Sequence, residues 1–75
     1  MENGANINQQ DQNHETPLHL ASWKGNSRVV EFLLKNGAKR ELKNLDEQTA
    51  LDLAMKYSKI DVIRVFDKKI NETSD

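Results

Sequence analysis

The 75-residue chain has no cysteine, one proline, three glycines, and only one tryptophan, one tyrosine and two phenylalanines. Without cysteine it can form neither a disulfide bond nor a thiolate metal site. No apolar run approaches the ~20 residues of a membrane-spanning helix, and no signal-peptide pattern opens the chain. We therefore expect an intracellular, cytoplasmic protein without a membrane partner.

An excess of charge of one sign is also lacking. The formal net charge is -1, so bulk electrostatics do not favour binding to nucleic acid. Lys39, Arg40 and Lys43 form a short basic stretch, but nucleic-acid binding needs more bases on one face, with aromatic residues between them. We expect this stretch to be a solvated loop and predict no nucleic-acid partner.

No combination of residues typical of an enzyme is present. The chain has no Gly-x-Ser-x-Gly sequence and no glycine-rich phosphate loop. His14 and His19 superficially resemble part of a zinc-hydrolase motif, but they are five residues apart, and Pro17 places His14 before the helix begins. A helix would not align the two rings. We predict no catalytic residue, no metal and no cofactor.

An internal repeat dominates the sequence. When the chain is shifted by 33 residues, identical residues coincide at turn-forming and apolar positions. The matched pairs are Asn3-Gly4-Ala5 with Asn36-Gly37-Ala38, Thr16 with Thr49, Leu18 with Leu51, Leu20 with Leu53, Ala21 with Ala54, Val29 with Val62 and Lys35 with Lys68. This period is one of the few that correspond to a known solenoid unit.

Each unit predicts a pair of helices. In the first unit, Thr16 supplies a capping hydroxyl and Pro17 suits the first helical position, so a short helix is expected from there to near Gly25. A second helix is predicted over residues 28–35, because its apolar residues cover much of the circumference. Gly37 ends it, since glycine adopts a left-handed conformation at little cost.

The second unit repeats this plan less clearly. We predict helices near residues 50–57 and 60–69, separated from the first unit by a polar loop or hairpin over 39–48. For the second helix of each pair, the sequence offers Asn26 or Ser27 as a cap in the first unit, and a stretch with the form of a capping box in the second. That stretch is Ser58-Lys59-Ile60-Asp61.

The first unit resembles the ankyrin repeat. The residues that carry the resemblance are Thr16-Pro17-Leu18-His19-Leu20-Ala21, then Gly25, then Val29-Val30-Glu31-Phe32-Leu33-Leu34-Lys35-Asn36-Gly37-Ala38. The resemblance implies an all-α solenoid of stacked helix-turn-helix units, joined by hairpin-like loops that project at right angles. It also implies that His19 and Thr16 form hydrogen bonds that tie the helix start to the loop and to the neighbouring repeat. The structural motif residues are thus Thr16, Pro17, Leu18, His19, Gly25 and Gly37.

The resemblance divides the chain into three parts. Residues 1–13 match the end of a preceding repeat and its loop, 14–46 form a repeat with an intact motif, and 47–75 form a degenerate C-terminal repeat with a polar tail. In the last part, Asp52 replaces the histidine of the family and Ser58 replaces a glycine. Asp67 puts a charge where another repeat would pack, which favours a cap at this end. At the other end we expect upstream repeats, because the chain opens at the end of a helix.

The resemblance also implies partner-binding positions on the loop tips and first helices. They are Gln12, Asn13, Glu15, Trp23 and Lys24 in the first repeat, and Leu45, Asp46, Gln48, Lys56 and Tyr57 in the second. Trp23 is the favoured anchor, since tryptophan is over-represented among binding hot spots; the alternative is that it covers its own loop or the core. Leu45 is either an anchor or a local packing residue.

Three functional hypotheses follow. The leading one is a protein–protein interaction module that presents these side chains as a preorganised surface for another protein. In the second, the repeats are a structural cap of a longer ankyrin-repeat protein and bind no ligand. In the third, the exposed N-terminal face of the stack pairs with another copy to form a homo-oligomer. The sequence does not identify the partner.

Overall fold

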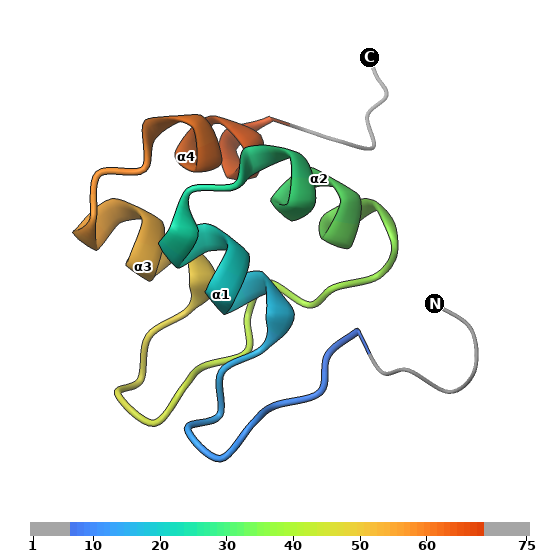
Figure 1. Cartoon of the computed structure of the whole chain (residues 1–75), viewed down its shortest axis with the longest axis vertical. Coiled ribbons are helices and arrows are strands. Elements are labelled where there is room, and N and C mark those ends of the chain that lie inside the picture. The colour runs from blue at the N-terminus through green and yellow to red at the C-terminus, as the bar shows by residue number, and fades with distance from the viewer. Residues whose placement is uncertain (1–6, 69–75) are drawn as a thin grey trace.

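The computed structural model describes residues 7–68, which contain four helices and no strand. The helices are α1 (Pro17–Lys24), α2 (Ser27–Lys35), α3 (Ala50–Lys56) and α4 (Ile60–Asp67). Helix α1 packs against α2 and α3, and α4 packs against the same two helices. Figure 1 shows α1 beside α3 in one layer, with α2 and α4 above them. The fold is the all-α helix-turn-helix stack that the sequence predicts.

The first helix of each pair starts on a threonine. Thr16 has an extended backbone and its side chain accepts a hydrogen bond from the backbone N–H of His19, with Pro17 at the first helical position. Thr49 accepts in the same way from the N–H of Asp52. Because a hydroxyl at this position satisfies an N–H that the helix itself leaves unpaired, the two threonines fix the starts of α1 and α3.

The turn between the helices of each pair requires a left-handed residue. Gly25 has φ 78° in the first pair, and Ser58 has φ 56° at the equivalent position of the second. The predicted capping box at Ser58 is therefore wrong: the residue that caps α4 is Lys59, which makes no side-chain capping hydrogen bond. Ser58 is part of the turn, so its backbone is not in the extended conformation that a capping residue normally adopts.

The predicted helix bounds differ from the observed ones by one or two residues. Helix α2 begins one residue before the predicted 28–35, because Asn26 is its cap and accepts from the N–H of Val29. Helix α3 ends one residue before the predicted end, and α4 ends at Asp67. Lys69 lies outside the described residues, as do Asn3-Gly4-Ala5 and the polar tail.

The core lies between the two helix pairs. It consists of Leu18, Ala21, Val30, Leu33, Ala50, Ala54, Val62, Val65 and Phe66. Three alanines belong to α1 and α3, the two helices that pack side by side. Their short side chains leave little volume between α1 and α3 where the two helices pack.

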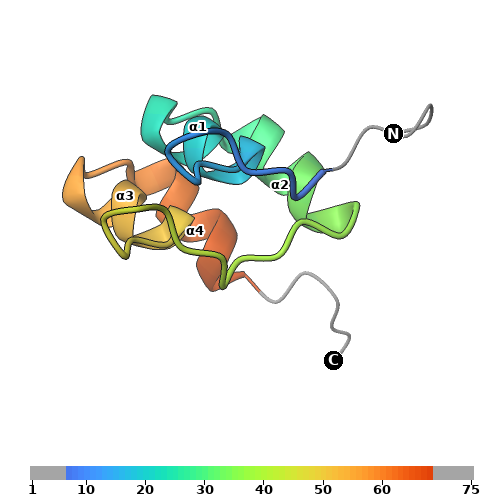
Figure 2. The ribbon, with the colours of Figure 1, turned by 90° about the horizontal axis from the view of Figure 1, so that it is seen from below.

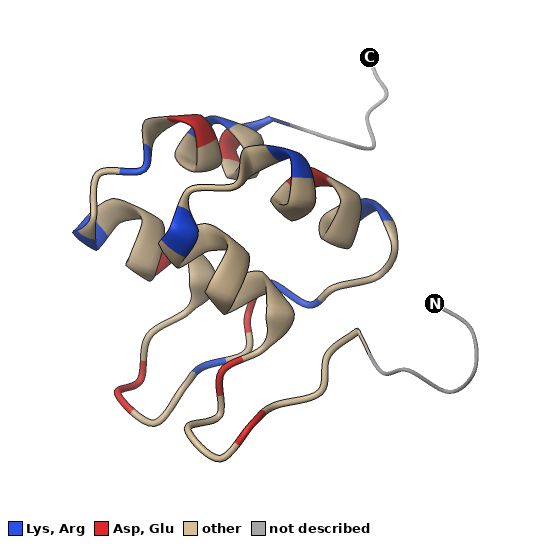
Figure 3. Ribbon diagram, in the orientation of Figure 1, with Lys and Arg blue, Asp and Glu red and all other residues tan. Residues whose placement is uncertain are grey.

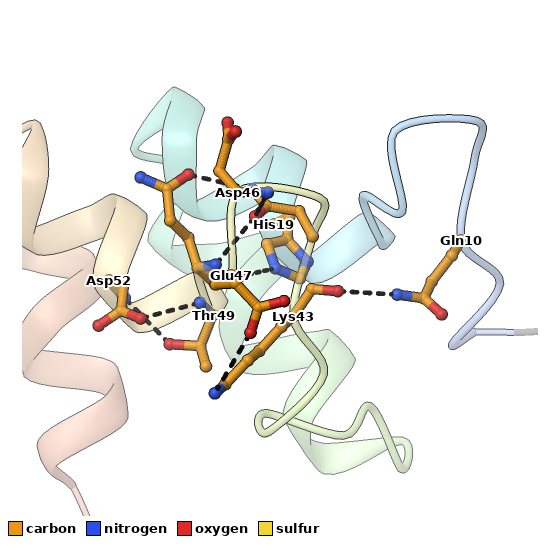
Figure 4. A network of polar contacts seen from close by, with 9 residues as sticks. Gln10, His19, Lys43, Asp46, Glu47, Thr49 and Asp52 are labelled. Atoms are coloured by element: carbon orange, nitrogen blue, oxygen red, sulfur yellow. Dashed lines mark hydrogen bonds and ion pairs between the residues drawn. The ribbon is translucent and has the colours of Figure 1, made fainter.

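Two loops leave the α1/α3 layer on the same side (Figure 1), and Figure 2 shows them one beside the other from below. The backbone N–H of Leu45 donates to the carbonyl of Asn13 at 3.1 Å. The Gln10 side-chain amide donates to the Lys43 carbonyl at 3.1 Å (Figure 4). These bonds join the two loops into one projecting structure.

Candidate functional site

Each loop tip is braced by one short polar side chain. In the first loop, Asp11 Oδ1 accepts hydrogen bonds from the backbone N–H groups of Asn13 (2.8 Å) and Glu15 (2.9 Å). In the second loop, Asn44 Oδ1 accepts two 2.9 Å bonds from the residues at the equivalent positions. Asp and Asn favour such turns because their side chains reach the backbone two residues further on. Each tip is thus held by hydrogen bonds within its own loop.

Asn44 also links the two loops. It is buried, and its Nδ2 donates to Glu15 Oε2 and to Gln48 Oε1, both at 3.1 Å. Sequence reasoning did not select Asn44 or Asp11. The signal was present, since both residues favour Asx turns and they lie one repeat length apart.

His19 connects the first helix to the next repeat. The ring is buried; its Nδ1 accepts from the backbone N–H of Thr16 at 3.1 Å, and its Nε2 lies 2.8 Å from the carbonyl oxygen of Gln48. Because Nδ1 accepts, the proton is on Nε2, which donates to Gln48. Figure 4 shows the ring beside the second loop. His19 therefore makes the bonds that the family resemblance implies for it.

Side chains from both repeats line one groove of about 330 Å³ between the loops and the α1/α3 layer. Its lining residues are Asp11, Asn13, Glu15, Leu20, Trp23, Asp46, Gln48, Leu53, Lys56 and Tyr57. Residues 33 apart occur together in this set, so the two repeats build the groove jointly.

An aromatic pair forms one wall of the groove. The rings of Trp23 and Tyr57 meet edge to face, with centroids 6.4 Å apart and planes at 84°. Lys56 Nζ lies 5.5 Å from the centroid of the Tyr57 ring. Trp23 keeps 47% of its surface exposed, so the pair supports the indole from one side and leaves it accessible from the other.

The groove has two oppositely charged ends. Acidic residues lie along both loops, and basic residues lie at the ends of α1 and α3 (Figure 3). Among the lining residues, Asp11, Glu15 and Asp46 are at the loop end and Lys56 is at the helix end. Lys24 ends α1 in the same way, and both lysines face the negative ends of their helix dipoles.

The family model described as "Ankyrin repeats (many copies)" matches residues 1–54. This chain belongs to the ankyrin-repeat family. It is 42% identical over 59 residues to alpha-latroinsectotoxin-Lt1a of Latrodectus tredecimguttatus, covering 79% of this chain and 4% of the toxin. It is 43% identical over 54 residues to inversin of Canis lupus familiaris, covering 72% of this chain and 5% of inversin.

A fowlpox virus ankyrin repeat protein, FPV244, is 32% identical over 72 residues, with 95% of this chain and 11% of the viral protein covered. The chain thus spans only a small share of the length of these ankyrin-repeat relatives. The family membership accounts for the helix pairs and projecting loops, and the partners of such long proteins do not transfer to a short stretch of repeats.

Seven of the ten ankyrin-type positions predicted to bind a partner line the groove. The other three, Gln12, Lys24 and Leu45, do not. Leu45 sits at the tip of its loop with 58% of its surface exposed. The groove residues that the prediction omitted are Asp11, Leu20 and Leu53.

The basic residues Arg40 and Lys43 of the second loop make contacts with different parts of the molecule. The Arg40 guanidinium lies 5.0 Å from the centroid of the Phe66 ring, and its Nη2 donates to the Phe66 carbonyl at 2.7 Å. Lys43 Nζ lies 3.9 Å from a carboxylate oxygen of Glu47. Arg40 therefore anchors the loop to α4, while Lys43 faces an acid of its own loop.

Two further properties apply to the described part of the chain. Between residues 7 and 68, no three His, Asp or Glu side chains come together in an arrangement that could hold a metal ion. In the same range, every helix is too short or too polar to cross a lipid bilayer.

Proposed function

We propose that this ankyrin-repeat chain is a protein–protein interaction module, without catalysis of its own, whose groove holds side chains of a partner. The observation that carries the proposal is the exposed Trp23, packed edge to face on Tyr57 inside a groove lined by both repeats. A cytoplasmic location is part of this proposal, and cell fractionation tests it.

The groove is suited to binding because it needs little ordering. The tips are held by Asp11 and Asn44, and His19 fixes the second loop to α1. A surface that is already ordered loses less entropy on association, so more of the contact energy remains as affinity. Its volume of about 330 Å³ accommodates a few side chains, at the low end of the range for ligand pockets.

The charges favour one orientation of the partner. The loop end offers the exposed carboxylates of Asp11 and Asp46, with Glu15 bonded to Asn44 behind them, and the helix end offers Lys56. A complementary segment carries a basic side chain toward the loops, an apolar one against Trp23, and an acidic one toward α3. Charge complementarity of this kind sets orientation and association rate more than affinity.

The test is binding by Trp23→Ala, with Phe32→Ala as the matched control. Phe32 is also an exposed aromatic residue on a helix, 54% accessible, but it does not line the groove. A partner is captured from cell lysate, identified, and titrated calorimetrically against the three proteins after circular dichroism has established equal helicity. Trp23→Ala should weaken binding by more than about 1 kcal/mol, roughly fivefold in Kd, with no change for Phe32→Ala.

Two results contradict this proposal. Equal affinity of Trp23→Ala and the original chain removes Trp23 as the anchor. Loss of helicity in Trp23→Ala assigns the indole to the fold rather than to a partner.

A further inference from the structure

Both ends of the helix stack carry exposed apolar side chains. At the N-terminal face, Leu20, Val29 and Phe32 are 45%, 40% and 54% exposed. At the C-terminal face, a hollow of about 380 Å³ is lined by Arg40, Leu51, Met55, Ile63, Phe66 and Asp67. Such patches on a small domain indicate a missing interaction.

The repeat itself shows what covers the N-terminal face. Leu20, Val29 and Phe32 occupy the same positions in the first repeat as Leu53, Val62 and Val65 do in the second, where exposure is 6%, 0% and 7%. The helices that carry these residues hold equivalent places in the two helix pairs. The difference in burial is therefore made by the neighbouring repeat: the first repeat packs on the second, and no repeat among residues 7–68 packs on the other side of the first.

At the C-terminal face the exposed residues belong to the second repeat, and their equivalents in the first repeat are buried. Ser22 of the first repeat is fully buried, whereas the equivalent Met55 is 53% exposed. Leu18 and Val30 are also fully buried, and their counterparts in the second repeat, which line the hollow, are only partly so. Each open face of the stack thus repeats one side of an interface that is already formed inside the molecule.

We propose that the N-terminal face of one copy of this chain packs on the C-terminal face of a second copy, as the second repeat packs on the first. Each open face has one larger apolar side chain than its buried counterpart, although Asp67 stands at the position of Leu34. Met55 stands at the position of Ser22, and Phe32 at the position of Val65. The new contact continues the established interface and buries larger side chains than the internal one does.

A polar contact between the loops is also preserved in complementary form. Inside the molecule, Asn44 donates to Glu15 across the two loops at 3.1 Å. One repeat length away, these positions are Asp11 of one copy and Gln48 of the other. The donor and acceptor exchange sides, because the Gln48 amide can donate to the Asp11 carboxylate.

The charges at the helix ends need one rearrangement. The internal interface carries an ion pair between Glu31 and Lys68, at 3.4 Å. Its equivalents between copies are Arg64 and Lys35, two bases. Lys35 already pairs with Glu31 of its own helix at 3.6 Å, and Asp67, three residues after Arg64, is the acid that the C-terminal face adds. Asp67, which at the level of sequence favoured the end of the stack, then serves the contact between copies.

The proposed contact joins two different faces, so it is heterologous and does not close into a symmetric dimer. Copies would add end to end, and the mean mass would rise with concentration. Neither Phe32 nor Met55 lines the groove. Asp11, Leu20 and Gln48 belong to both surfaces, so substitutions at Phe32 and Met55 test self-association without altering a groove residue.

The test is sedimentation of the full 75-residue chain from micromolar to millimolar concentration, together with Phe32→Glu and Met55→Glu. Each substitution puts a charge on one face only, at a residue more than half exposed. The original chain should show a mean mass that rises with concentration, and each variant alone should stay a monomer. An equimolar mixture of the two variants should form a 1:1 dimer of twice the monomer mass and nothing larger, because one intact face of each kind remains.

Three results overturn the proposal. The first is an original chain that stays monomeric at every concentration. The second is a dimer formed by either variant alone, which indicates pairing of like faces. The third is a mixture that stays monomeric although both variants retain native circular dichroism and unfold cooperatively. Trp23→Ala serves as the control in the groove and should associate like the original chain.

Discussion

The two repeats begin their first helices with the same threonine but with different partners for it. In the first repeat, His19 completes the helix start and reaches the Gln48 carbonyl of the next repeat. In the second, Asp52 Oδ2 accepts from the Thr49 N–H at 2.9 Å and closes a capping box within its own helix. The comparison separates two tasks of the motif. A carboxylate suffices to start the helix, but the longer ring is needed to hold the neighbouring repeat.

The turn between the two helices is also better supported in the first repeat than in the second. Gly25 adopts its left-handed conformation without strain, and Asn26 then caps α2. Ser58 adopts a left-handed conformation that costs a side-chain-bearing residue energy, and Lys59 leaves α4 without a side-chain cap. The second repeat thus keeps the shape of the first with weaker local support.

Among the substitutions that test this comparison, we expect His19→Ala to have the largest effect on stability. It should lower the free energy of unfolding by about 2–4 kcal/mol, because a buried ring is lost and its hydrogen-bond partners lose their contacts. Asp52→Ala removes only an exposed cap and should cost about 1 kcal/mol. Urea unfolding followed by circular dichroism measures both. Equal losses for the two variants would mean that His19 acts only as a local cap.

Substitution of the two turn residues, Gly25 and Ser58, should have an intermediate effect on stability. Gly25→Ala should cost about 1–2 kcal/mol, since alanine is strained at positive φ, and its Cβ would lie 3.1 Å from Lys59 Cδ. Ser58→Gly should gain about 0.5 kcal/mol, because relief of strain is partly offset by the greater chain entropy of glycine. Thermal unfolding of both variants checks the signs, and a destabilised Ser58→Gly would show that Ser58 is not strained.

The smallest effect concerns the two ion pairs of Glu31, one with Lys35 inside α2 and one with Lys68 just after α4. A hydrogen bond from Lys68, the charge of Lys68 and then that of Lys35 lower the pKa of Glu31 below its ordinary value. A lowered folded-state pKa means that the stabilisation is present above the unfolded value, roughly 4.3, and is lost as the pH falls through the folded value. The Tm difference between the original chain and Glu31→Gln should therefore be small and positive at pH 7, and should disappear in acid.

Glu41→Gln is the control for this prediction. Glu41 is exposed and forms no ion pair within the described residues. Its substitution should leave the Tm unchanged at both pH values. A Glu31→Gln difference that persists in acid would assign the effect to packing rather than charge.

Much of the fold follows from local signals. The threonines, Pro17 and Gly37 mark helix starts and ends through interactions within a few residues, and the period of 33 places the second unit. The exception is Ser58, where residue types suggested a cap. The backbone there is set by the turn between two packed helices, at the position where the family resemblance implies a glycine.

The site was harder to predict than the fold, because it depends on contacts between repeats. Leu20 and Leu53 are the same residue at the same repeat position, yet one is 45% exposed and the other 6%. Nothing in either residue's own sequence neighbourhood distinguishes them. Likewise, the residue type of Asn44 indicates a turn, but its link to the other loop depends on the bond that its amide donates to Glu15.

The braced loop tips have a consequence for how selectivity is encoded. Each tip is braced by one residue, Asp11 or Asn44, whose side-chain oxygen accepts hydrogen bonds from backbone N–H groups of the tip. The bonds that Asn44 makes to other side chains go to Glu15 and Gln48, not to Asn13 or Asp46. The side chains of Asn13 and Asp46 are therefore not needed to maintain the turn. They can be exchanged for residues of other size or charge while the loops keep their shape. The partner preference of the groove can therefore change without a change of fold.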